Sequence, residues 1–326
     1  MTTPTATVLI PSYNHAAFID EALAGVLLPE YPDIEVVLVD DGSTDDTLDR
    51  LAPWREDPRL RVFTQENRGA HAALNRGVSL ARGEVVFILN SDDAYRPERI
   101  GRFLERFATE PELALLASWL EVVDGQGALL GVKEGFRNMP PWPRRRRGAG
   151  LSDDGEPLLA LVEANYVATT SNVAFRRRIF DETRFLALRY AHDWDFFLGA
   201  GMTGRFELIE EPLVRYRVHG SNTISEGKEA ELGRGHMRFE VLWVMARHAE
   251  RVLARFTTAA RGAGELAERL WTSLPPFVSE PLFAQLLHLR GRERRVPAAY
   301  DQLLAEDHPF RRAAIRALAV RPGDLA

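Results

Sequence analysis

The first part of the chain alternates between short, nearly continuous apolar runs and longer segments whose apolar residues recur at helical spacing. A continuous apolar run is typical of a strand that is covered on both faces of a sheet. Such runs predict four strands, at residues 6–10, 34–39, 60–63 and 84–89. Helical patterns follow over residues 15–28, from about Asp45, and after Gly69. This alternation predicts an α/β fold with a Rossmann-like, mostly parallel sheet flanked by helices.

The pattern changes after residue 97. The sequence predicts strands at 113–123, 128–132, 171–175 and 213–219, and helices over 97–108, 156–164 and from about 191. From about residue 227 the strand signals fade, and further helices are predicted at 264–273, 279–290, 295–305 and 308–317. We therefore expect an α/β domain over residues 1–225 and a helical C-terminal region over residues 226–326.

Composition excludes several classes of protein. The 326 residues are 45% apolar and 27% charged with a formal net charge of −6, so no global basic field is present to hold nucleic acid. The absence of cysteine excludes disulfides and thiolate metal sites and fits a reducing cytosol. No signal peptide is visible, and no apolar run approaches the roughly 20 residues of a membrane span. We expect a cytoplasmic protein, either soluble or peripheral to the inner face of the membrane.

Polar motifs follow the predicted strands at the ends where parallel strands share one edge of a sheet. Residues 11–14 follow the first strand, residues 40–45 the second, and residues 90–93 the fourth. Ligands bind outside these carboxyl ends in open α/β sheets. The adjacent carboxylates of Asp92 and Asp93 repel each other unless a cation is near, and Mg²⁺ or Mn²⁺ also binds phosphates. The residues alone leave two alternatives, a metal–diphosphate site and a polar turn that caps the next helix.

Six motifs together resemble the family 2 glycosyltransferases, which are inverting enzymes with the GT-A fold. They are Pro11-Ser12-Tyr13-Asn14, Val39-Asp40-Asp41-Gly42-Ser43-Thr44-Asp45, Glu66-Asn67-Arg68-Gly69, Asn90-Ser91-Asp92-Asp93, His192-Asp193-Trp194-Asp195 and Tyr216-Arg217-Val218-His219-Gly220-Ser221-Asn222. The resemblance covers about residues 6–222. It implies transfer of a sugar from a nucleotide-diphosphate donor, a UDP-sugar, to a hydroxyl of a glycan, lipid-linked glycan or protein, with Mn²⁺ or Mg²⁺ as cofactor. The implied pathway is polysaccharide or glycoconjugate biosynthesis.

The resemblance assigns nucleotide binding to residues that follow the first three strands. Pro11 and Tyr13 belong to the motif that holds the base, on which the Tyr13 ring would stack, and Asp41 would accept from a base N–H or a ribose hydroxyl. Tyr13 can equally be a surface residue over a turn, and Asp41 can serve as a helix cap. Asn67 lies where a helix N-terminus would attract phosphate or sugar oxygens, or else in a plain loop.

For the acidic turn, the resemblance implies metal coordination by Asp93, with Asp92 contacting the ribose or sugar. The family motif more often begins with aspartate, where this chain has Asn90. The neutral imidazole of His219 is implied as a further metal ligand, and the alternative is a loop histidine bonded to the backbone. The metal would act as a Lewis acid on the departing diphosphate.

Asp193 is implied as the general base. Inverting transfer needs a carboxylate that accepts the proton of the acceptor hydroxyl as this attacks the anomeric carbon, across the sugar from the diphosphate. The family motif usually reads Glu-Asp, whereas this chain reads His192-Asp193, so the implied base is retained. The alternative is that Asp193 caps the helix that begins there.

Three other functions are alternatives. A nucleotidyltransferase usually needs a glycine- and lysine-rich loop after its first strand, where this chain has residues 11–14. A phosphoacceptor signalling domain is much shorter and needs a lysine near its acidic pocket. A degenerate, binding-only transferase is suggested by Asn90 and His192.

Two further segments have possible partners. The arginine run at 144–147 is either solvated or steers an anionic acceptor or lipid head group. The C-terminal helices can form a homodimer interface.

Overall fold

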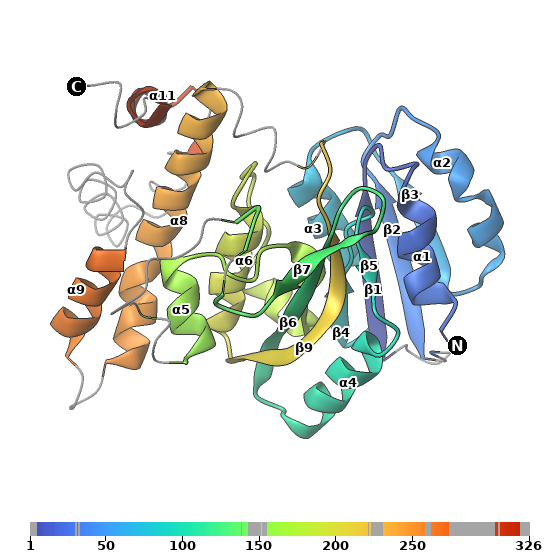
Figure 1. The fold of residues 1–326 in the computed structure, drawn as a ribbon, viewed down its shortest axis with the longest axis horizontal. Helices are drawn as coiled ribbons and strands as arrows, with labels where there is room; N and C mark the ends of the chain where they lie inside the picture. Colours follow the sequence, from blue (N-terminus) through green and yellow to red (C-terminus); the bar gives the residue numbers. More distant parts are fainter. Residues whose placement is uncertain are drawn as a thin grey trace. The chain divides into compact units, whose positions relative to one another are not determined.

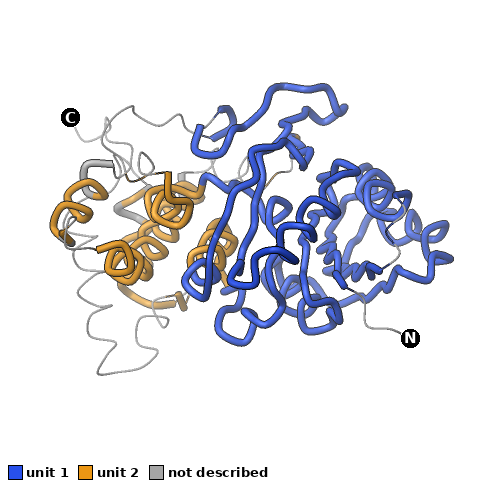
Figure 2. Tube along the Cα trace, turned by 90° about the horizontal axis from the view of Figure 1, so that it is seen from below, with its two compact units in different colours: residues 1–145, 166–186, 199–218 blue, residues 146–165, 187–198, 219–326 orange. Residues whose placement is uncertain are grey.

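The computed structural model (Figure 1) describes residues 5–29, 31, 33–137, 139–142, 151, 155–220, 222, 231–257, 262–273, 304–305 and 307–319. The chain forms two compact units that interleave along the sequence (Figure 2). The first contains residues 1–145, 166–186 and 199–218, and the second contains residues 146–165, 187–198 and 219–326. The division into domains at residue 225 stays a prediction, and the arginine run at 144–147 lies outside the described residues.

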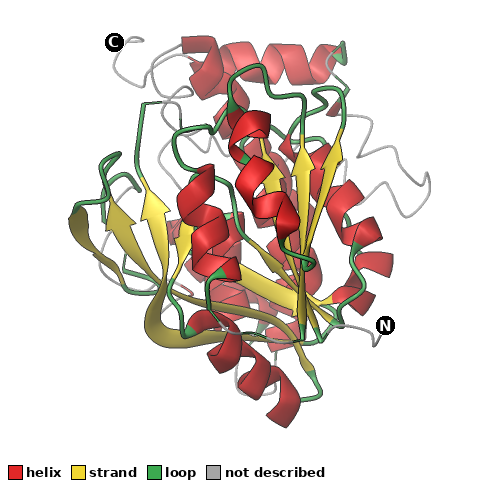
Figure 3. Cartoon of the chain, turned by 90° about the vertical axis from the view of Figure 1, so that its right-hand side faces the viewer, coloured by secondary structure: helices red, strands yellow, loops and turns green. Residues whose placement is uncertain are grey.

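The first unit is built on one nine-stranded sheet (Figure 3). The strand order is β3-β2-β1-β4-β8-β6-β9-β5, with β7 beside β6. The strands are β1 (Ala6–Ser12), β2 (Ile34–Asp40), β3 (Leu60–Thr64), β4 (Val85–Ile88), β5 (Ala94–Tyr95), β6 (Leu113–Val123), β7 (Leu129–Lys133), β8 (Val173–Arg176) and β9 (Arg205–Arg217). The first four strands pair in parallel, as β6 and β9 do, and the other pairs are antiparallel. The predicted α/β sheet is confirmed.

Helices cover both faces of the parallel half of the sheet. Successive strand residues point to opposite faces, which is why the strands read as continuous apolar runs. On one face, Val8 belongs to a core cluster with residues of α1 and α4. On the other face, α3 lies so close that a Cβ on Gly77 would be 2.0 Å from Cδ1 of Leu9. The helices are α1 (Ile19–Leu27), α2 (Thr47–Arg50), α3 (Ala70–Leu80) and α4 (Arg99–Thr109).

The polar motifs follow strands that end at one edge of the sheet, as the sequence predicts. In the parallel register of β1, Ser12 lies opposite Asp40 of β2. On the other side of β1, Leu9 lies opposite Ile88 of β4. The chain therefore leaves these three strands on the same side, and the three polar segments come together there.

Strand β9 begins earlier than predicted, at Arg205 rather than at residue 213. Three glutamates, at 207, 210 and 211, and the proline at 212 break the apolar pattern in its first half. Its register on β6 also shifts on both sides of Trp119. The irregular segment still pairs with β6, so tertiary pairing overrides a weak local signal.

The second unit is helical. Its long helix α8 contacts α5, α9 and α11, and buries Phe239, Trp243 and Met245. The helices are α5 (Pro157–Glu163), α6 (His192–Gly201), which runs on into the first unit, α8 (Glu231–Phe256), α9 (Ala263–Ser273) and α11 (Pro309–Ala319). The helices predicted at 264–273 and 308–317 are confirmed, whereas those at 279–290 and 295–305 fall almost wholly outside the described residues. Among the helices that the structure describes, none has the length and apolarity needed to cross a bilayer.

Candidate functional site

The loops that follow β1 and β2 are tied together by Asn14. This residue adopts a left-handed backbone conformation with φ of 54°, which asparagine tolerates better than most residues. Its Oδ1 accepts from the backbone N–H of Thr44 at 2.7 Å, and its own N–H donates to Ser43 Oγ at 2.9 Å. Beside it Tyr13 is 43% exposed, and Pro11, in β1, is half-buried. An exposed tyrosine beside a fixed turn can stack on a base, while base binding by Tyr13 and Pro11 stays a prediction.

Asp40 is a structural carboxylate. It is fully buried, and its Oδ1 accepts from the backbone N–H groups of Gly42 and Ser43 at 3.2 and 3.0 Å. Its Oδ2 accepts from Ser43 Oγ at 2.5 Å. These bonds fold the chain into a turn as it leaves β2.

Asp41 fixes the loop that carries Asn67. Its Oδ1 accepts from Gln65 Nε2 at 2.7 Å and from the N–H of Arg68 at 3.0 Å, and its Oδ2 accepts from the N–H of Gly69 at 2.8 Å. Gly69 has φ of 86°, and α3 begins at the next residue. The side chain of Asp41 therefore holds the N-terminus of α3 at the edge of the sheet, with Asn67 exposed. Nucleotide or sugar binding by Asp41 and Asn67 stays a prediction.

The hydrogen bonds of Asn90 explain why this chain can have an amide at a position where the motif that it resembles more often has aspartate. Its Nδ2 donates to Thr169 Oγ1 at 3.0 Å, and its Oδ1 accepts from Thr170 Oγ1 at 2.7 Å. Its backbone N–H donates to Ser171 Oγ at 2.9 Å. An amide offers both a donor and an acceptor, whereas an ionised carboxylate offers acceptors only. Asn90 therefore matches its two threonine partners and holds segment 169–171 against the end of β4.

Asp93 also anchors the fold. It is 2% exposed, and each of its oxygens accepts a hydrogen bond, Oδ2 from Ser171 Oγ at 2.6 Å and Oδ1 from the N–H of Arg217 at 2.9 Å. Burial, together with the charge of Asp92, holds the pKa of Asp93 well above its usual range. The guanidinium of Arg217 donates in turn to the backbone carbonyl of Asp92 at 3.0 Å. The predicted metal ligand is thus joined through one oxygen to the turn that precedes β8 and through the other to the end of β9.

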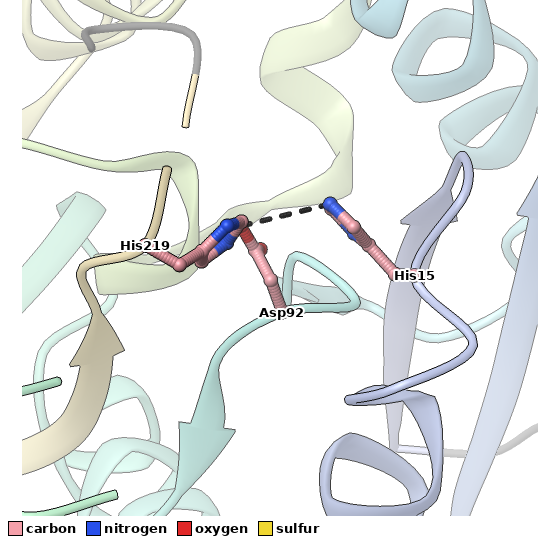
Figure 4. A group of neighbouring side chains, drawn as sticks. All are labelled: His15, Asp92 and His219. Carbon is pink, nitrogen blue, oxygen red and sulfur yellow. Dashed lines mark ion pairs between the residues drawn. The ribbon is translucent and has the colours of Figure 1, made fainter. Parts of the chain in front are cut away.

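The neighbouring carboxylate, Asp92, lies in a group of three side chains of types that can ligate a metal (Figure 4). One donor atom from each of His15, Asp92 and His219 falls within 4.8 Å of the other two. Asp92 Oδ2 is 3.9 Å from His15 Nε2. His219 comes two residues after the end of β9, and its N–H donates to Asn222 Oδ1 at 2.5 Å.

The sequence predicted only part of this group. His219 was expected as a ligand, Asp92 as a sugar or ribose contact, and His15 was not expected at all. His15 directly follows the Pro11–Asn14 motif, yet no spacing in the sequence reveals that its ring turns toward the end of β4. Adjacent residues in a turn point their side chains in different directions, so Asp92 reaches the group while Asp93 turns into the protein. The assignment of Asp93 as a metal ligand has no support from this geometry.

Asp193 lies in the second unit, one residue after the start of α6. It is 8% exposed, its Oδ2 accepts from Asn165 Nδ2 at 3.1 Å, and its Oδ1 accepts from the N–H of Trp194 at 2.6 Å. Burial raises the pKa of Asp193 above its usual range. A buried, oriented carboxylate of raised basicity has the properties of a general base, a role that stays a prediction for this residue.

Glu240 of α8 accepts hydrogen bonds from the backbone just before the N-terminal end of α6. Its carboxylate accepts from the backbone N–H groups of Arg189, Tyr190 and Ala191, at 3.0, 2.7 and 3.2 Å. A glutamate from another helix therefore satisfies the donors that precede α6. Asp193 lies inside the first turn instead, so it does not occupy the cap position that the alternative interpretation gave it.

Residues 7–184 match the model of the family described as Glycosyl transferase family 2. An uncharacterized glycosyltransferase of Nostoc sp. (strain PCC 7120) is 29% identical over 221 residues, which cover 66% of this chain and 65% of that protein. Chondroitin synthase of Escherichia coli is 29% identical over 221 residues, which cover 68% of this chain and 30% of that protein. The chain thus spans less than two thirds of the length of these relatives.

Solved structures are similar in fold. S. aureus TarS 1–349 in complex with UDP-GlcNAc superposes with a TM-score of 0.61 and 20% identity, covering 96% of this chain and 89% of that one. Mannosyltransferase PcManGT of Pyrobaculum calidifontis, in complex with GDP-Man and Mn²⁺, gives a TM-score of 0.50 and 20% identity, covering 98% and 86%. At these identities the likeness concerns the fold, and it agrees with the predicted GT-A architecture.

Proposed function

The chain belongs to glycosyl transferase family 2, and on this basis we propose that it moves a sugar from a nucleotide-diphosphate donor, a UDP-sugar, to a hydroxyl acceptor with inversion at the anomeric carbon. The observation that carries the proposal is the convergence of His15, Asp92 and His219 beside the carboxyl edge of the sheet. Ligands of open α/β sheets bind at this edge.

The donor set fits a divalent cation. One carboxylate and two imidazoles could together hold a divalent cation of the first transition row, the group of metals that includes Mn²⁺. We assign the carboxylate to Asp92, because both oxygens of Asp93 already accept hydrogen bonds from the protein. When bound, the cation would neutralise the charge that develops on the departing diphosphate.

The donor is held by residues of the first unit. Tyr13 would stack on the base, next to Pro11, and Asp41 keeps the 65–69 loop in position so that Asn67 can contact phosphate or sugar oxygens. The exposure of Tyr13, at 43%, supports this role, as does its place beside Asn14, which fixes the turn. Two of the similar proteins support a UDP-sugar as donor and a glycan as acceptor. They are TarS, whose structure was solved in complex with UDP-GlcNAc, and chondroitin synthase.

Asp193 would act as the base. The acceptor oxygen forms a bond to the anomeric carbon while the bond from that carbon to the diphosphate oxygen breaks, through an oxocarbenium-like transition state. The proton of the acceptor hydroxyl passes to the carboxylate of Asp193, and the electron pair of the broken bond leaves with the diphosphate. Asn165 and the N–H of Trp194 orient the carboxylate, and burial makes it a stronger base than an exposed aspartate.

The proposal is tested by titrating the full chain with UDP-sugars, with and without Mn²⁺, and by measuring UDP release on addition of glycan acceptors. We expect at least one UDP-sugar to bind, with a higher affinity when Mn²⁺ is present. Exclusive binding of a nucleotide-sugar with another base would refute the UDP assignment. A protein that binds none of them, with or without Mn²⁺, would refute the function itself. Binding without UDP release would instead favour the binding-only alternative.

A further inference from the structure

We propose that His15 is a third protein ligand of the divalent cation, beside Asp92 and His219, and that this two-imidazole, one-carboxylate set selects Mn²⁺ over Mg²⁺. The inference rests on the proposed function, since it assumes that a cation accompanies the nucleotide donor. It adds a ligand that the sequence motifs did not indicate, and a preference among metals that follows from that ligand.

The backbone holds His15 firmly in place. Its N–H donates to Thr47 Oγ1 at 3.0 Å. Its carbonyl accepts from the N–H groups of Phe18 and Ile19 at 2.9 and 3.0 Å, at the start of α1. The left-handed turn at Asn14 precedes it. A side chain on such a backbone starts from a defined position, which a metal ligand requires.

The ring is oriented by a serine. His15 Nδ1 lies 2.7 Å from Ser91 Oγ, and Ser91 is 1% exposed. A hydrogen bond at one ring nitrogen sets the tautomer and aims the other nitrogen, as is typical of metal-binding histidines. When Nδ1–H donates to Ser91, the lone pair of Nε2 is directed toward the Asp92 carboxylate (Figure 4).

The distance between His15 Nε2 and Asp92 Oδ2 fits two ligands of one ion better than a direct hydrogen bond between the two side chains. The 3.9 Å from His15 Nε2 to Asp92 Oδ2 is longer than a hydrogen bond. Two ligand atoms that each lie about 2.1 Å from an ion are roughly 3 to 4.2 Å apart, depending on the angle at the metal. His219 brings a third donor atom within 4.8 Å of both. These distances leave room for an ion among the three.

The ligand types predict the selectivity. Mg²⁺ prefers oxygen ligands and retains its waters, whereas imidazole favours the transition metals. A site with one imidazole and one carboxylate would discriminate weakly, and a second imidazole strengthens the preference for Mn²⁺. Replacing His15 should therefore lower Mn²⁺ affinity much more than Mg²⁺ affinity.

Pulsed electron paramagnetic resonance of the full chain loaded with Mn²⁺ and UDP counts the imidazole nitrogens bound to the metal. We expect two in the wild-type protein and one in each of His15→Gln and His219→Gln, because glutamine keeps a polar side chain without a ring nitrogen. His308→Asn is the matched control, since His308 contacts Phe310 at the start of α11 and should leave the count at two. Calorimetry on His15→Gln should show Mn²⁺ affinity reduced by roughly 10-fold or more, with little change for Mg²⁺.

A second variant, at Ser91, distinguishes a histidine that binds the metal from one with only a structural role. Ser91→Ala should keep both nitrogens on the metal but weaken Mn²⁺ binding, because the ring loses the partner that orients it. An unchanged nitrogen count in His15→Gln, with UDP and Mn²⁺ still bound, would overturn the role of His15 and leave the proposed function standing. Absence of any Mn²⁺ bound with UDP in the wild-type protein would overturn both the role of His15 and the metal dependence of the proposed function, whereas only a protein that binds no UDP-sugar at all would overturn the function itself.

Discussion

The backbone N–H of Arg217 donates to Asp93 Oδ1 at 2.9 Å, which joins two residues 124 positions apart in the sequence. The other oxygen of Asp93 accepts from Ser171, 78 positions away. One buried carboxylate therefore connects the segment between β4 and β5 with the turn that precedes β8 and with the end of β9. Its neighbour Asp92 is turned toward two histidines instead. The two adjacent aspartates therefore lie in different surroundings, Asp93 buried between segments of the fold and Asp92 in the group that we propose to bind a cation.

Asp93→Ala is expected to lower the free energy of unfolding by about 2–4 kcal/mol, because it leaves the Ser171 hydroxyl and the Arg217 N–H buried without their acceptor. Asp93→Asn should cost less, since its Oδ1 can still accept from Arg217 and the Ser171 hydroxyl can rotate to accept from its amide. Urea denaturation of the three proteins measures both effects. An alanine variant as stable as the wild type would contradict the structural role of Asp93.

Asp92→Asn is expected to abolish the Mn²⁺ dependence of UDP binding while leaving the unfolding midpoint nearly unchanged. The side chain is partly exposed, so its substitution removes a charge without opening a cavity. Calorimetry with and without Mn²⁺ measures the change, and Asp181→Asn, an exposed carboxylate of the same unit, is the control. If Asp93→Asn loses Mn²⁺ binding and Asp92→Asn retains it, the assignment of the ligand to Asp92 is wrong and the sequence-based one is right.

Asp193→Asn is expected to reduce sugar transfer by roughly 10²–10⁴-fold without weakening UDP binding, because an amide cannot accept the proton of the acceptor hydroxyl. Single-turnover kinetics and UDP titration provide the two readouts. Asp307→Asn, at an exposed position of the same unit, is the control. Turnover close to that of the wild type would end the assignment of Asp193 as base.

The pH dependence of transfer provides an independent check on Asp193. The base must be ionised, so the rate should rise with pH through its pKa, and burial raises that pKa. The acidic limb of kcat/KM should therefore lie at a higher pH than an exposed aspartate would give, and it should be absent from the residual activity of Asp193→Asn. A limb at the ordinary position of an aspartate would contradict the buried environment.

Lys133 provides a prediction about stability alone. It is 2% exposed in β7, its Nζ donates to the carbonyls of Gly135 at 2.7 Å and of Tyr166, and burial lowers its pKa from 10.5 to about 7. The unfolded chain therefore binds more protons than the folded one between pH 7 and 10.5, so stability should rise with pH across that window. Below pH 7 both states are charged and the cost of burying the ammonium is present in full.

The measurement compares the wild-type protein with Lys133→Met by urea denaturation at several pH values. The difference between the two free energies of unfolding should change by up to about 1.4 kcal/mol per pH unit within the window and level off on either side. Loss of the two hydrogen bonds shifts the variant by an amount that does not depend on pH. Parallel curves for the two proteins would show that the lysine does not titrate as its burial implies.

The sequence predicted the parallel half of the sheet well because its strands are buried on both faces, and burial leaves a continuous apolar signal in β1, β2 and β4. It also predicted that the polar motifs follow at one edge, since parallel strands must end together. The first half of β9 carried no such signal, because glutamates and a proline interrupt the apolar pattern there. Only the pairing of β9 with β6 reveals that half as a strand.

The candidate site was predicted less completely because a motif specifies residue types and not the direction of side chains. The acidic pair was found, but the sequence offered no way to tell that Asp92 faces the histidines and Asp93 faces Ser171. His15 was missed for a related reason, since its ring is oriented by Ser91, 76 positions away. Predicting such a group needs the contacts between loops, which only the folded chain supplies.

Because β9 comes late in the sequence, the edge of β6 that pairs with it stays exposed during part of translation. During translation, β6 leaves the ribosome roughly ten seconds before β9, at synthesis rates of about 5–20 residues per second. Until then its long edge, which pairs with β9 along most of its length, is open to strands of other nascent chains. A shortened gene that stopped at residue 184, where the family match ends, would make this temporary exposure permanent. We expect its product to collect in inclusion bodies, whereas a chain extended through β9 can close the sheet.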